Sequence, residues 1–240
     1  MAGTMKVVVH RLLGFKRVLV HVNDIGRVIL VRLNNCDLPL LYDIFCTDEC
    51  EIRLSWTPKT VVDLGANIGL TALKLKKQFP SAKVIAVEPD AHTAEVCASN
   101  LKHLPDCMVL HRAVGFESAS VVCTNPQAQA ISRRFRACNS EASESIGTIS
   151  IGTILAQYEC SPPVLIKMDI EGAEEECFQH ADEWLESVQA VLVEPHSERI
   201  EETIRRTLTK HGFSTRKIGE KIYGERALVN STHADPTPWR

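Results

Sequence analysis

The chain has 240 residues, 45% of them hydrophobic, and its 27 basic and 30 acidic residues give a formal net charge of −3. This length suits one sizeable α/β domain, and the balanced charge argues against a nucleic-acid-binding surface. No stretch reaches the roughly 18 uninterrupted apolar residues that a membrane helix needs, and the N-terminus lacks the features of a signal peptide, so a cytoplasmic protein is expected.

Cysteine and histidine give no sign of a metal centre. The nine cysteines are scattered, odd in number and without a C-x-x-C pair, which is typical of reduced thiols. His103, Cys107 and His111 are evenly spaced, but Pro105 would break a helix that aligned them. Zinc sites usually have tighter ligand pairs, so no metal site is predicted.

The N-terminal segment differs from the rest of the chain. Residues 5–33 contain the apolar, alternating stretches KVVVHRL, KRVLVHV and RVILVRL, the last two separated by the turn sequence NDIG at 23–26, which predicts a β-hairpin or small sheet. DLPLLYDIFCTDE at 37–49 is expected to form a linking helix. The predicted division is an N-terminal element at 1–55, a main domain at 56–230 and a tail at 231–240.

From residue 60, apolar β-type runs alternate with amphipathic stretches. This alternation predicts a parallel sheet with helices on both faces. Helix boundaries are supported by Asp90 and Ser197 as N-caps and by Gly212 after the last helix. The expected strands are 60–65, 83–89, 107–114, 164–170 and 187–196, and the expected helices are 68–79, 91–103, 173–180 and 197–211.

Two segments complete the predicted main domain. STRKIG at 214–219 and RALVN at 226–230 are expected to form an antiparallel pair at one sheet edge. Residues 125–147 show no clear period, and a loop of this length is usually functional or disordered. Its position before the strand that leads to Asp169 would suit a lid.

The tip of the first main-domain strand, VVDLGANIGL, favours a ligand site. Gly65 and Gly69 allow a tight turn before a helix whose free N–H groups can face an anion, although such a turn also occurs without a ligand. Asn67 replaces the middle glycine of the dinucleotide fingerprint, which disfavours a pyrophosphate. Glu88 at the next strand tip suits two ribose hydroxyls. A cofactor with a ribose but no pyrophosphate fits both observations.

DLGANIG together with AVEPD resembles the nucleoside-binding motifs of class I S-adenosylmethionine-dependent methyltransferases, and KMDIEGAE resembles the signature of the FkbM family within that class. The resemblance covers roughly residues 60–212. It implies a Rossmann-like, mostly parallel seven-stranded sheet with an antiparallel edge strand and S-adenosylmethionine across the first two strand tips. It assigns the methionine end to Asp63, Gly65, Ala66, Asn67 and Gly69, the ribose to Glu88, and the adenine to Arg112 and Ala113. Asp63 has the alternative role of capping the turn.

The strand tip in KMDIEG carries the predicted chemistry. Period-two alternation places Lys167, Asp169 and Glu171 on one side of the strand. Methyl transfer needs alignment of donor and nucleophile, and a hydroxyl acceptor must lose its proton to a carboxylate or histidine. Asp169 is the first candidate for orienting the acceptor and the sulfonium end of the cofactor, and Glu194 and His196 are second candidates for acceptor contact or general base.

Several neighbouring residues have structural alternatives. Glu174, Glu175 and Glu176 suit the first turn of a helix, Lys167 suits neutralisation of Asp169 or Glu171, and His196 suits a helix start. The loop arginines Arg133, Arg134 and Arg136 could bind an anionic acceptor, or simply be solvated. Ile151 and Gly152 replace a Leu-Asp pair frequent in the family, so the acceptor could differ from those of relatives.

The favoured prediction is a methyltransferase that acts on a hydroxyl of a small molecule or sugar. N-methylation remains open, because an amine would need the same alignment. A noncatalytic cofactor-binding or partner-binding protein with this fold is the alternative from another class. An NAD-linked enzyme is disfavoured by Asn67 at the middle glycine position.

Overall fold

A seven-stranded sheet organises the main part of the chain in the computed structural model, which describes residues 16–33, 35–47, 52–115, 119–129, 133–138 and 145–227. The strand order is β12-β13-β11-β10-β3-β4-β5, and β3 pairs in parallel with both β10 and β4. The predicted mostly parallel, seven-stranded sheet is confirmed. Its strands are β3 (Thr60–Leu64), β4 (Lys83–Glu88), β5 (Cys107–His111), β10 (Val164–Met168), β11 (Ala190–Val193), β12 (Ser214–Ile218) and β13 (Lys221–Glu225).

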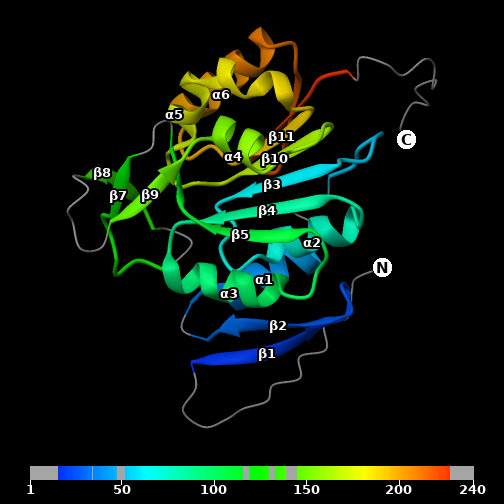
Figure 1. Ribbon diagram of the computed structural model, residues 1–240, viewed down its shortest axis with the longest axis vertical. Coiled ribbons are helices and arrows are strands. Elements are labelled where there is room, and N and C mark those ends of the chain that lie inside the picture. The colour runs from blue at the N-terminus through cyan, green and yellow to red at the C-terminus, as the bar shows by residue number, and fades with distance from the viewer. Residues whose placement is uncertain are drawn as a thin grey trace.

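Alternate residues of the central strands enter different apolar clusters. Val61 of β3 packs in a cluster with residues of α2 and α3, whereas Val62 packs in a second cluster with residues of α4, α5 and α6. Figure 1 shows these two groups of helices on opposite sides of the sheet. The helices are α2 (Leu70–Gln78), α3 (Ala91–Leu101), α4 (Ile151–Gln157), α5 (Glu174–Gln179) and α6 (Glu198–Lys210).

The predicted N-caps of α3 and α6 are confirmed. The Thr93 backbone N–H donates to Asp90 Oδ1 over 2.9 Å, and the Ile200 N–H donates to Ser197 Oγ over 3.2 Å. Gly212 follows α6 with φ of 77°, in the region that favours glycine. Within the described residues, none of the helices has the length and apolar character needed to cross a membrane.

The predicted antiparallel pair at the sheet edge exists, but its second strand was misplaced. β13 lies at Lys221–Glu225 instead of 226–230, and residues 228–230 lie outside the described residues. Ile218 pairs directly with Lys221, so only two residues form the turn, and Gly219 supplies its positive φ of 58°. The tight turn starts the return strand earlier than the sequence pattern indicated.

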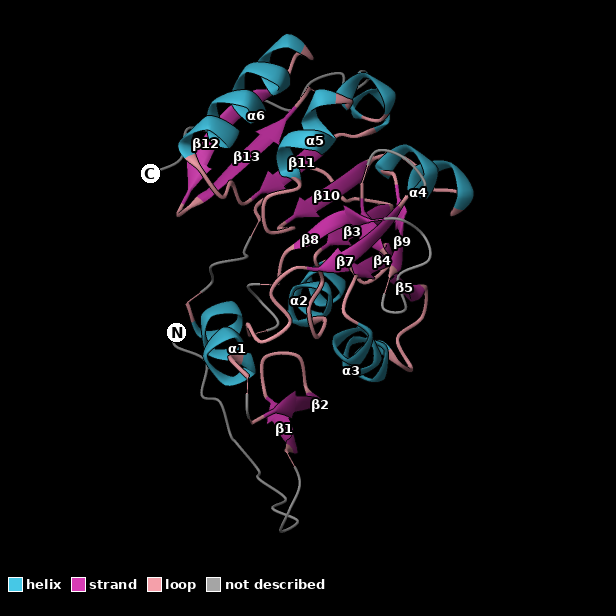
Figure 2. Cartoon of the chain, turned by 90° about the vertical axis from the view of Figure 1, so that its left-hand side faces the viewer, coloured by secondary structure: helices cyan, strands magenta, loops and turns pink. Residues whose placement is uncertain are grey.

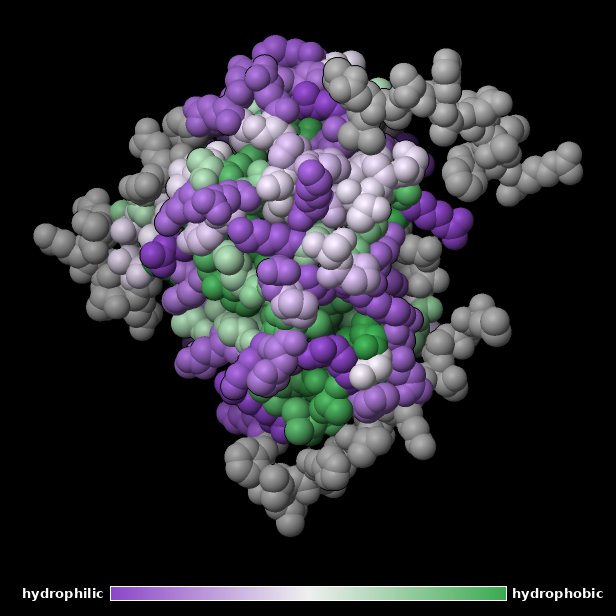
Figure 3. All heavy atoms as spheres, turned by 45° about the vertical axis from the view of Figure 1, so that its right-hand side comes forward, coloured by the Kyte–Doolittle hydropathy of each residue, from purple (hydrophilic) through white to green (hydrophobic). Residues whose placement is uncertain are grey.

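The N-terminal hairpin is confirmed and shares the main core. β1 (Arg17–Val22) and β2 (Arg27–Arg32) pair antiparallel, and α1 (Asp37–Cys46) follows. Val20 and Ile29 belong to the same buried cluster as Val61 of β3. KVVVHRL lies outside the described residues. Figure 3 shows apolar side chains gathered toward the lower end of one face, at the height of the hairpin in Figure 1.

A second, smaller sheet replaces part of the expected loop. Its order is β6-β9-β7-β8, formed by β6 (Ala113–Val114), β7 (Ser120–Cys123), β8 (Phe135–Cys138) and β9 (Ile146–Ile149). The prediction of one strand at 107–114 and of 125–147 without strands was therefore wrong. Segments of two to four residues are too short to show a period. Residues 130–132 and 139–144 lie outside the description. Figure 2 shows this sheet in front of one end of the larger one.

The remaining elements differ from the prediction in length. The expected strand at 187–196 is limited to Ala190–Val193, because residues 185–187 form a short 3₁₀ helix before it. Helix α4 at Ile151–Gln157 was not predicted. Ser150 starts it by accepting a hydrogen bond from the Thr153 N–H over 3.0 Å.

Candidate active site

A cavity of about 1130 Å³ lies where the strand tips meet the small sheet. This volume is slightly above the roughly 300–1,000 Å³ that is usual for pockets of single drug-sized ligands. Asp63, Gly69 and Arg112 are not among the lining residues, and their ligand contacts stay predictions. The predicted residues that line the cavity are Gly65, Ala66, Asn67, Glu88, Ala113, Asp169, Glu194 and His196.

The glycine turn after β3 brings two strand tips into contact. Gly65 has φ of 75°, and a Cβ added to it would lie 1.7 Å from the carbonyl oxygen of Asp169. Gly69 serves packing instead, since a Cβ there would lie 3.0 Å from Cys97 Sγ of α3. Only glycine at position 65 therefore allows β3 and β10 to present their ends to one cavity.

Glu88 is the acid at the tip of β4. Its Oε2 accepts the Asn67 backbone N–H and its Oε1 accepts the Asp90 N–H, each over 2.9 Å. Burial raises the pKa of Glu88 to about 7, although both N–H groups favour the charged form. Glu88 is 6% exposed and lines the cavity, so its carboxyl group is held in a fixed position at the cavity wall.

Asp63 and Lys167 form a buried ion pair beneath the turn. Lys167 Nζ lies 3.1 Å from Asp63 Oδ1 and 3.8 Å from Asp169 Oδ2, and it donates to the Gly65 carbonyl oxygen over 2.9 Å. Burial raises the pKa of Asp63, and Lys167 acts in the opposite direction. Asp63 therefore holds Lys167, which in turn ties the β3 turn to Asp169.

Arg32, which was not a candidate from the sequence, reaches the glycine turn after β3 from the hairpin. Its guanidinium donates to Asn67 Oδ1 over 3.1 Å and to Thr93 Oγ1 over 2.7 Å. It also forms a two-pronged pair with Asp37 over 2.8 and 2.9 Å. Asn67 has φ of 48°, so Arg32 supports a left-handed residue inside the turn.

His196 sits among carboxylates beyond the tip of β11. Its Nε2 lies 3.6 Å from Asp169 Oδ1 and 3.7 Å from Glu171 Oε2, and its Nδ1 lies 3.0 Å from Glu174 Oε1. Hydrogen bonding to Glu171 and Glu174 raises the pKa of His196 to about 10. In the absence of another cation the imidazolium is favoured at neutral pH, whereas a general base must be neutral.

Glu194 offers a second carboxylate on the same side of the cavity. The Glu194 backbone N–H donates to the Met168 carbonyl oxygen over 2.9 Å, which fixes it beside the tip of β10. Its Oε2 lies 3.0 Å from Lys221 Nζ of β13. Both side chains line the cavity.

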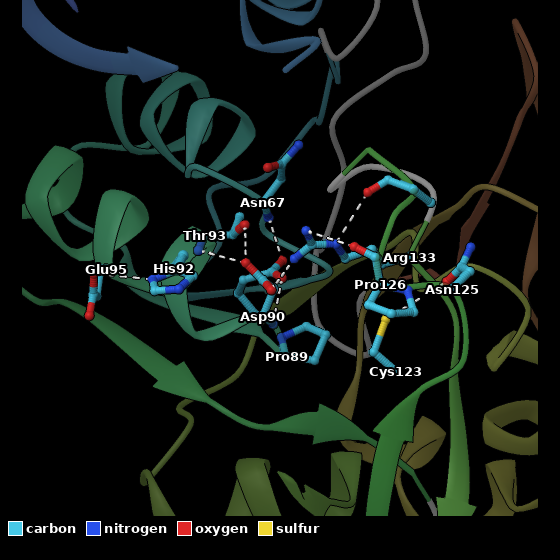
Figure 4. A network of polar contacts seen from close by, with 12 residues as sticks. Asn67, Pro89, Asp90, His92, Thr93, Glu95, Cys123, Asn125, Pro126 and Arg133 are labelled. Atoms are coloured by element: carbon cyan, nitrogen blue, oxygen red, sulfur yellow. Dashed lines mark hydrogen bonds and ion pairs between the residues drawn. The ribbon is translucent and has the colours of Figure 1, made fainter. Parts of the chain in front are cut away.

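The three loop arginines have different surroundings. Arg133 reaches across to Asp90 at the start of α3 and forms an ion pair with it, as Figure 4 shows. Arg134 and Arg136 also line the cavity, and the described residues contain no ion-pair partner for either. Arg133 thus pairs within the fold, whereas Arg134 and Arg136 lie at the cavity without an ion-pair partner among the described residues.

The model of the methyltransferase FkbM domain matches residues 63–215, which is more than half of the chain. The chain belongs to the FkbM methyltransferase family. The match contains both the turn at Gly65 and the KMDIEGAE segment, so the resemblance seen in the sequence is confirmed.

Individual relatives in this family cover the chain only in part. Methyltransferase sdnD from Sordaria araneosa is 32% identical over 79 residues, which is 32% of this chain and 30% of that protein. Hexuronic acid methyltransferase AglP from Haloferax volcanii is 28% identical over 153 residues, or 64% of this chain and 62% of that protein. The chain thus spans less than two thirds of either relative's length.

Among solved structures, fibrillarin from Aeropyrum pernix, in complex with natively bound S-adenosyl-L-methionine, has a TM-score of 0.45 and 12% identity. The alignment covers 92% of this chain and 100% of that one.

Proposed function

We propose that this chain is an S-adenosylmethionine-dependent methyltransferase that methylates a hydroxyl group of a small molecule or sugar. The observation that carries the proposal is that Glu88 and Asp169, from strands on either side of β3, line one cavity. Ligands of open α/β sheets bind beyond the carboxyl ends of the strands, where the strand order reverses. Here that point lies between β3 and β10.

The residues that line the cavity fit S-adenosylmethionine as the methyl donor. Glu88 is a buried carboxylate that suits ribose hydroxyls. Asn67 stands where the dinucleotide fingerprint has its middle glycine, the residue that lets the backbone approach a pyrophosphate. Asp169, held by Lys167, can face a cation such as a sulfonium. When bound, the cofactor supplies a methyl group on a sulfonium, whose carbon–sulfur bond breaks as the bond to the acceptor oxygen forms.

The contribution of the chain is alignment and acceptance of one proton. Asp169 orients the acceptor hydroxyl, and that hydroxyl's proton passes to a strand-tip carboxylate, Asp169 or Glu194, as the new oxygen–carbon bond forms. His196 contacts the acceptor side of the cavity. An amine acceptor would need the same alignment and less help from a base.

Two arginines of the cavity suit an acceptor with an acidic group. Arg134 and Arg136 line the cavity, and a guanidinium recognises a carboxylate through two parallel hydrogen bonds. A relative in the family, AglP, is named as a hexuronic acid methyltransferase. An acidic sugar therefore suits this site better than a neutral one.

The test is incubation of the full chain with S-adenosylmethionine labelled in its methyl group, offered a hexuronic acid glycoside, the matching neutral hexose and an amino sugar. We expect label on a hydroxyl of the uronic acid, and an increased KM when Arg134 and Arg136 are both replaced by alanine. Label on nitrogen alone would replace this proposal with N-methylation. Binding of S-adenosylhomocysteine without turnover on any hydroxyl in a metabolite extract would support a noncatalytic protein instead.

A further inference from the structure

Asp169, Glu171 and His196 bring three potential metal ligands together at the acceptor side of the cavity. One ligand atom from each lies within 4.8 Å of the others, and all three residues line the cavity. Asp169 directs Oδ2 toward Lys167 and Oδ1 toward His196. Two carboxylates that follow β10 and one imidazole that follows β11 therefore lie close together.

A carboxylate lies beside the second nitrogen of the His196 imidazole. Glu174 lies 3.0 Å from Nδ1 and is fully buried. Its two oxygens accept the backbone N–H groups of Ile170 and Gly172 over 2.9 Å each, so the carboxylate cannot turn away. Metal-bound histidines almost always donate their second N–H to such a carboxylate. A metal ion would take the place of the Nε2 proton, and Nε2 lies 3.6 Å from Asp169 Oδ1 and 3.7 Å from Glu171 Oε2.

The spacing allows an ion with only small movements. Three atoms within 4.8 Å of one another share a point within about 2.8 Å of each, and first-row metal ions bind nitrogen and carboxylate oxygen at about 2.0–2.2 Å. Movements of the three ligand atoms by less than about 1 Å, made by rotating the side chains, would bring them to these metal–ligand distances. A divalent ion would also neutralise the two carboxylates, which otherwise lie close together.

We propose that Asp169, Glu171 and His196 bind one divalent cation of the Mn²⁺ or Zn²⁺ type, with open coordination positions toward the cavity. Imidazole disfavours Mg²⁺ and Ca²⁺, which take oxygen ligands, whereas mixed nitrogen and carboxylate sets suit Mn²⁺ and Zn²⁺. The catalytic role of the ion rests on the proposed function: an acceptor hydroxyl coordinated to it loses its proton to Glu194 more readily, because the metal lowers the pKa of a bound hydroxyl.

Binding is tested on the full chain after treatment with EDTA and dialysis. Mn²⁺ is titrated and its free form is followed by electron paramagnetic resonance, with ZnCl₂ and MgCl₂ as competitors. We expect one saturable Mn²⁺ per chain, displaced by Zn²⁺ far better than by Mg²⁺. His196→Gln and Glu171→Gln should each weaken binding at least tenfold, as expected for loss of one ligand.

His211→Gln is the matched control. His211 Nε2 lies 2.8 Å from Asp182 Oδ1, so this histidine also pairs with an acid but lies outside the three-residue set, and its variant should bind Mn²⁺ like the wild type. The proposed metal site would be contradicted if neither Mn²⁺ nor Zn²⁺ bound saturably. It would also be contradicted if His196→Gln and Glu171→Gln bound Mn²⁺ as tightly as the wild type does. S-adenosylhomocysteine titrated into the EDTA-treated chain keeps the two proposals apart, since its binding tests the donor site without the metal.

Discussion

The backbone of Gly65 lies against the backbone of Asp169, so closely that a Cβ at position 65 would come within 1.7 Å of the Asp169 carbonyl oxygen. These residues are 104 positions apart in the sequence. Their contact joins the glycine turn after β3, where the methyl donor is proposed to bind, to the tip of β10, where Asp169 is proposed to orient the methyl acceptor. The contact is possible because β3 and β10 are adjacent and parallel, so that both strands end at the same edge of the sheet.

Gly65→Ala should therefore separate the two tips. The new methyl group collides with backbone that cannot rotate away, and overpacking of this kind costs about 1–3 kcal/mol of unfolding free energy. We expect the affinity for S-adenosylhomocysteine, measured by calorimetry, to fall more than tenfold. Gly26→Ala is the control for backbone strain, since Gly26 has a similar φ of 62° with nothing within 4 Å of an added Cβ. Equal losses in both variants would show that the collision is unimportant.

The buried pair of Asp63 and Lys167 predicts a double-mutant result. Lys167→Met leaves the Asp63 carboxylate without its cation, and breaking a buried pair in this way costs about 3–5 kcal/mol. Adding Asp63→Asn removes the uncompensated charge, so the double variant should regain part of the unfolding free energy measured by urea denaturation. If the double variant is less stable than Lys167→Met, the two side chains do not act as a pair.

Donor binding should depend on pH through Glu88. Its pKa of about 7 in the folded chain means that the carboxylate, the form proposed to accept hydrogen bonds from the ribose hydroxyls, is formed mainly above pH 7. The affinity for S-adenosylhomocysteine should rise about tenfold between pH 6 and pH 8, and Glu88→Gln should remove this dependence. A wild-type affinity that does not change over this interval would contradict the role of Glu88.

Glu88 should also make the unfolding free energy depend on pH, but this free energy should fall as the pH rises, whereas the donor affinity should rise. An acid whose pKa is raised from 4.5 to about 7 on folding binds its proton more tightly in the folded state. Its contribution to the unfolding free energy is complete below pH 4.5 and is lost as the pH rises to about 7. Relative to wild type, Glu88→Gln should lose this part of the pH dependence in urea denaturation.

The hairpin should influence the donor site through Arg32. Lysine cannot reproduce the fork by which Arg32 bonds Asp37 while reaching Asn67, so Arg32→Lys should lower both the unfolding free energy and the affinity for S-adenosylhomocysteine. Arg17→Lys is the matched control, because Arg17 is exposed on the neighbouring strand and surface changes usually stay within about 0.5 kcal/mol. Unchanged affinity in Arg32→Lys would separate the hairpin from donor binding.

The central strands and the strand-tip acids could be predicted because their signals are local. Continuous apolar runs mark β3, β4 and β10, and Glu88 and Asp169 come directly at their ends. The short strands β8 and β9 and the helix α4 have too few residues to show a period. The early start of β13 follows from a two-residue turn that the pattern did not reveal.

The contacts that complete the site are long-range and left no trace in the sequence. Arg32 meets Asn67 35 positions away, and Arg133 meets Asp90 43 positions away. Glu174 lies in the first turn of α5, as expected, but it is also buried and lies 3.0 Å from His196 Nδ1. His196 was a candidate from its place at a strand tip, but its carboxylate partners come from the turn after β10, and only the fold brings them together.

The central claim is that the strand-tip cavity binds a nucleoside methyl donor through Glu88. It is tested most directly by isothermal titration of the full chain with S-adenosylhomocysteine and, in parallel, with NAD. We predict saturable binding of one S-adenosylhomocysteine per chain, weakened at least tenfold in Glu88→Ala, and no measurable binding of NAD. Failure to bind S-adenosylhomocysteine, or tighter binding of NAD, would contradict the account.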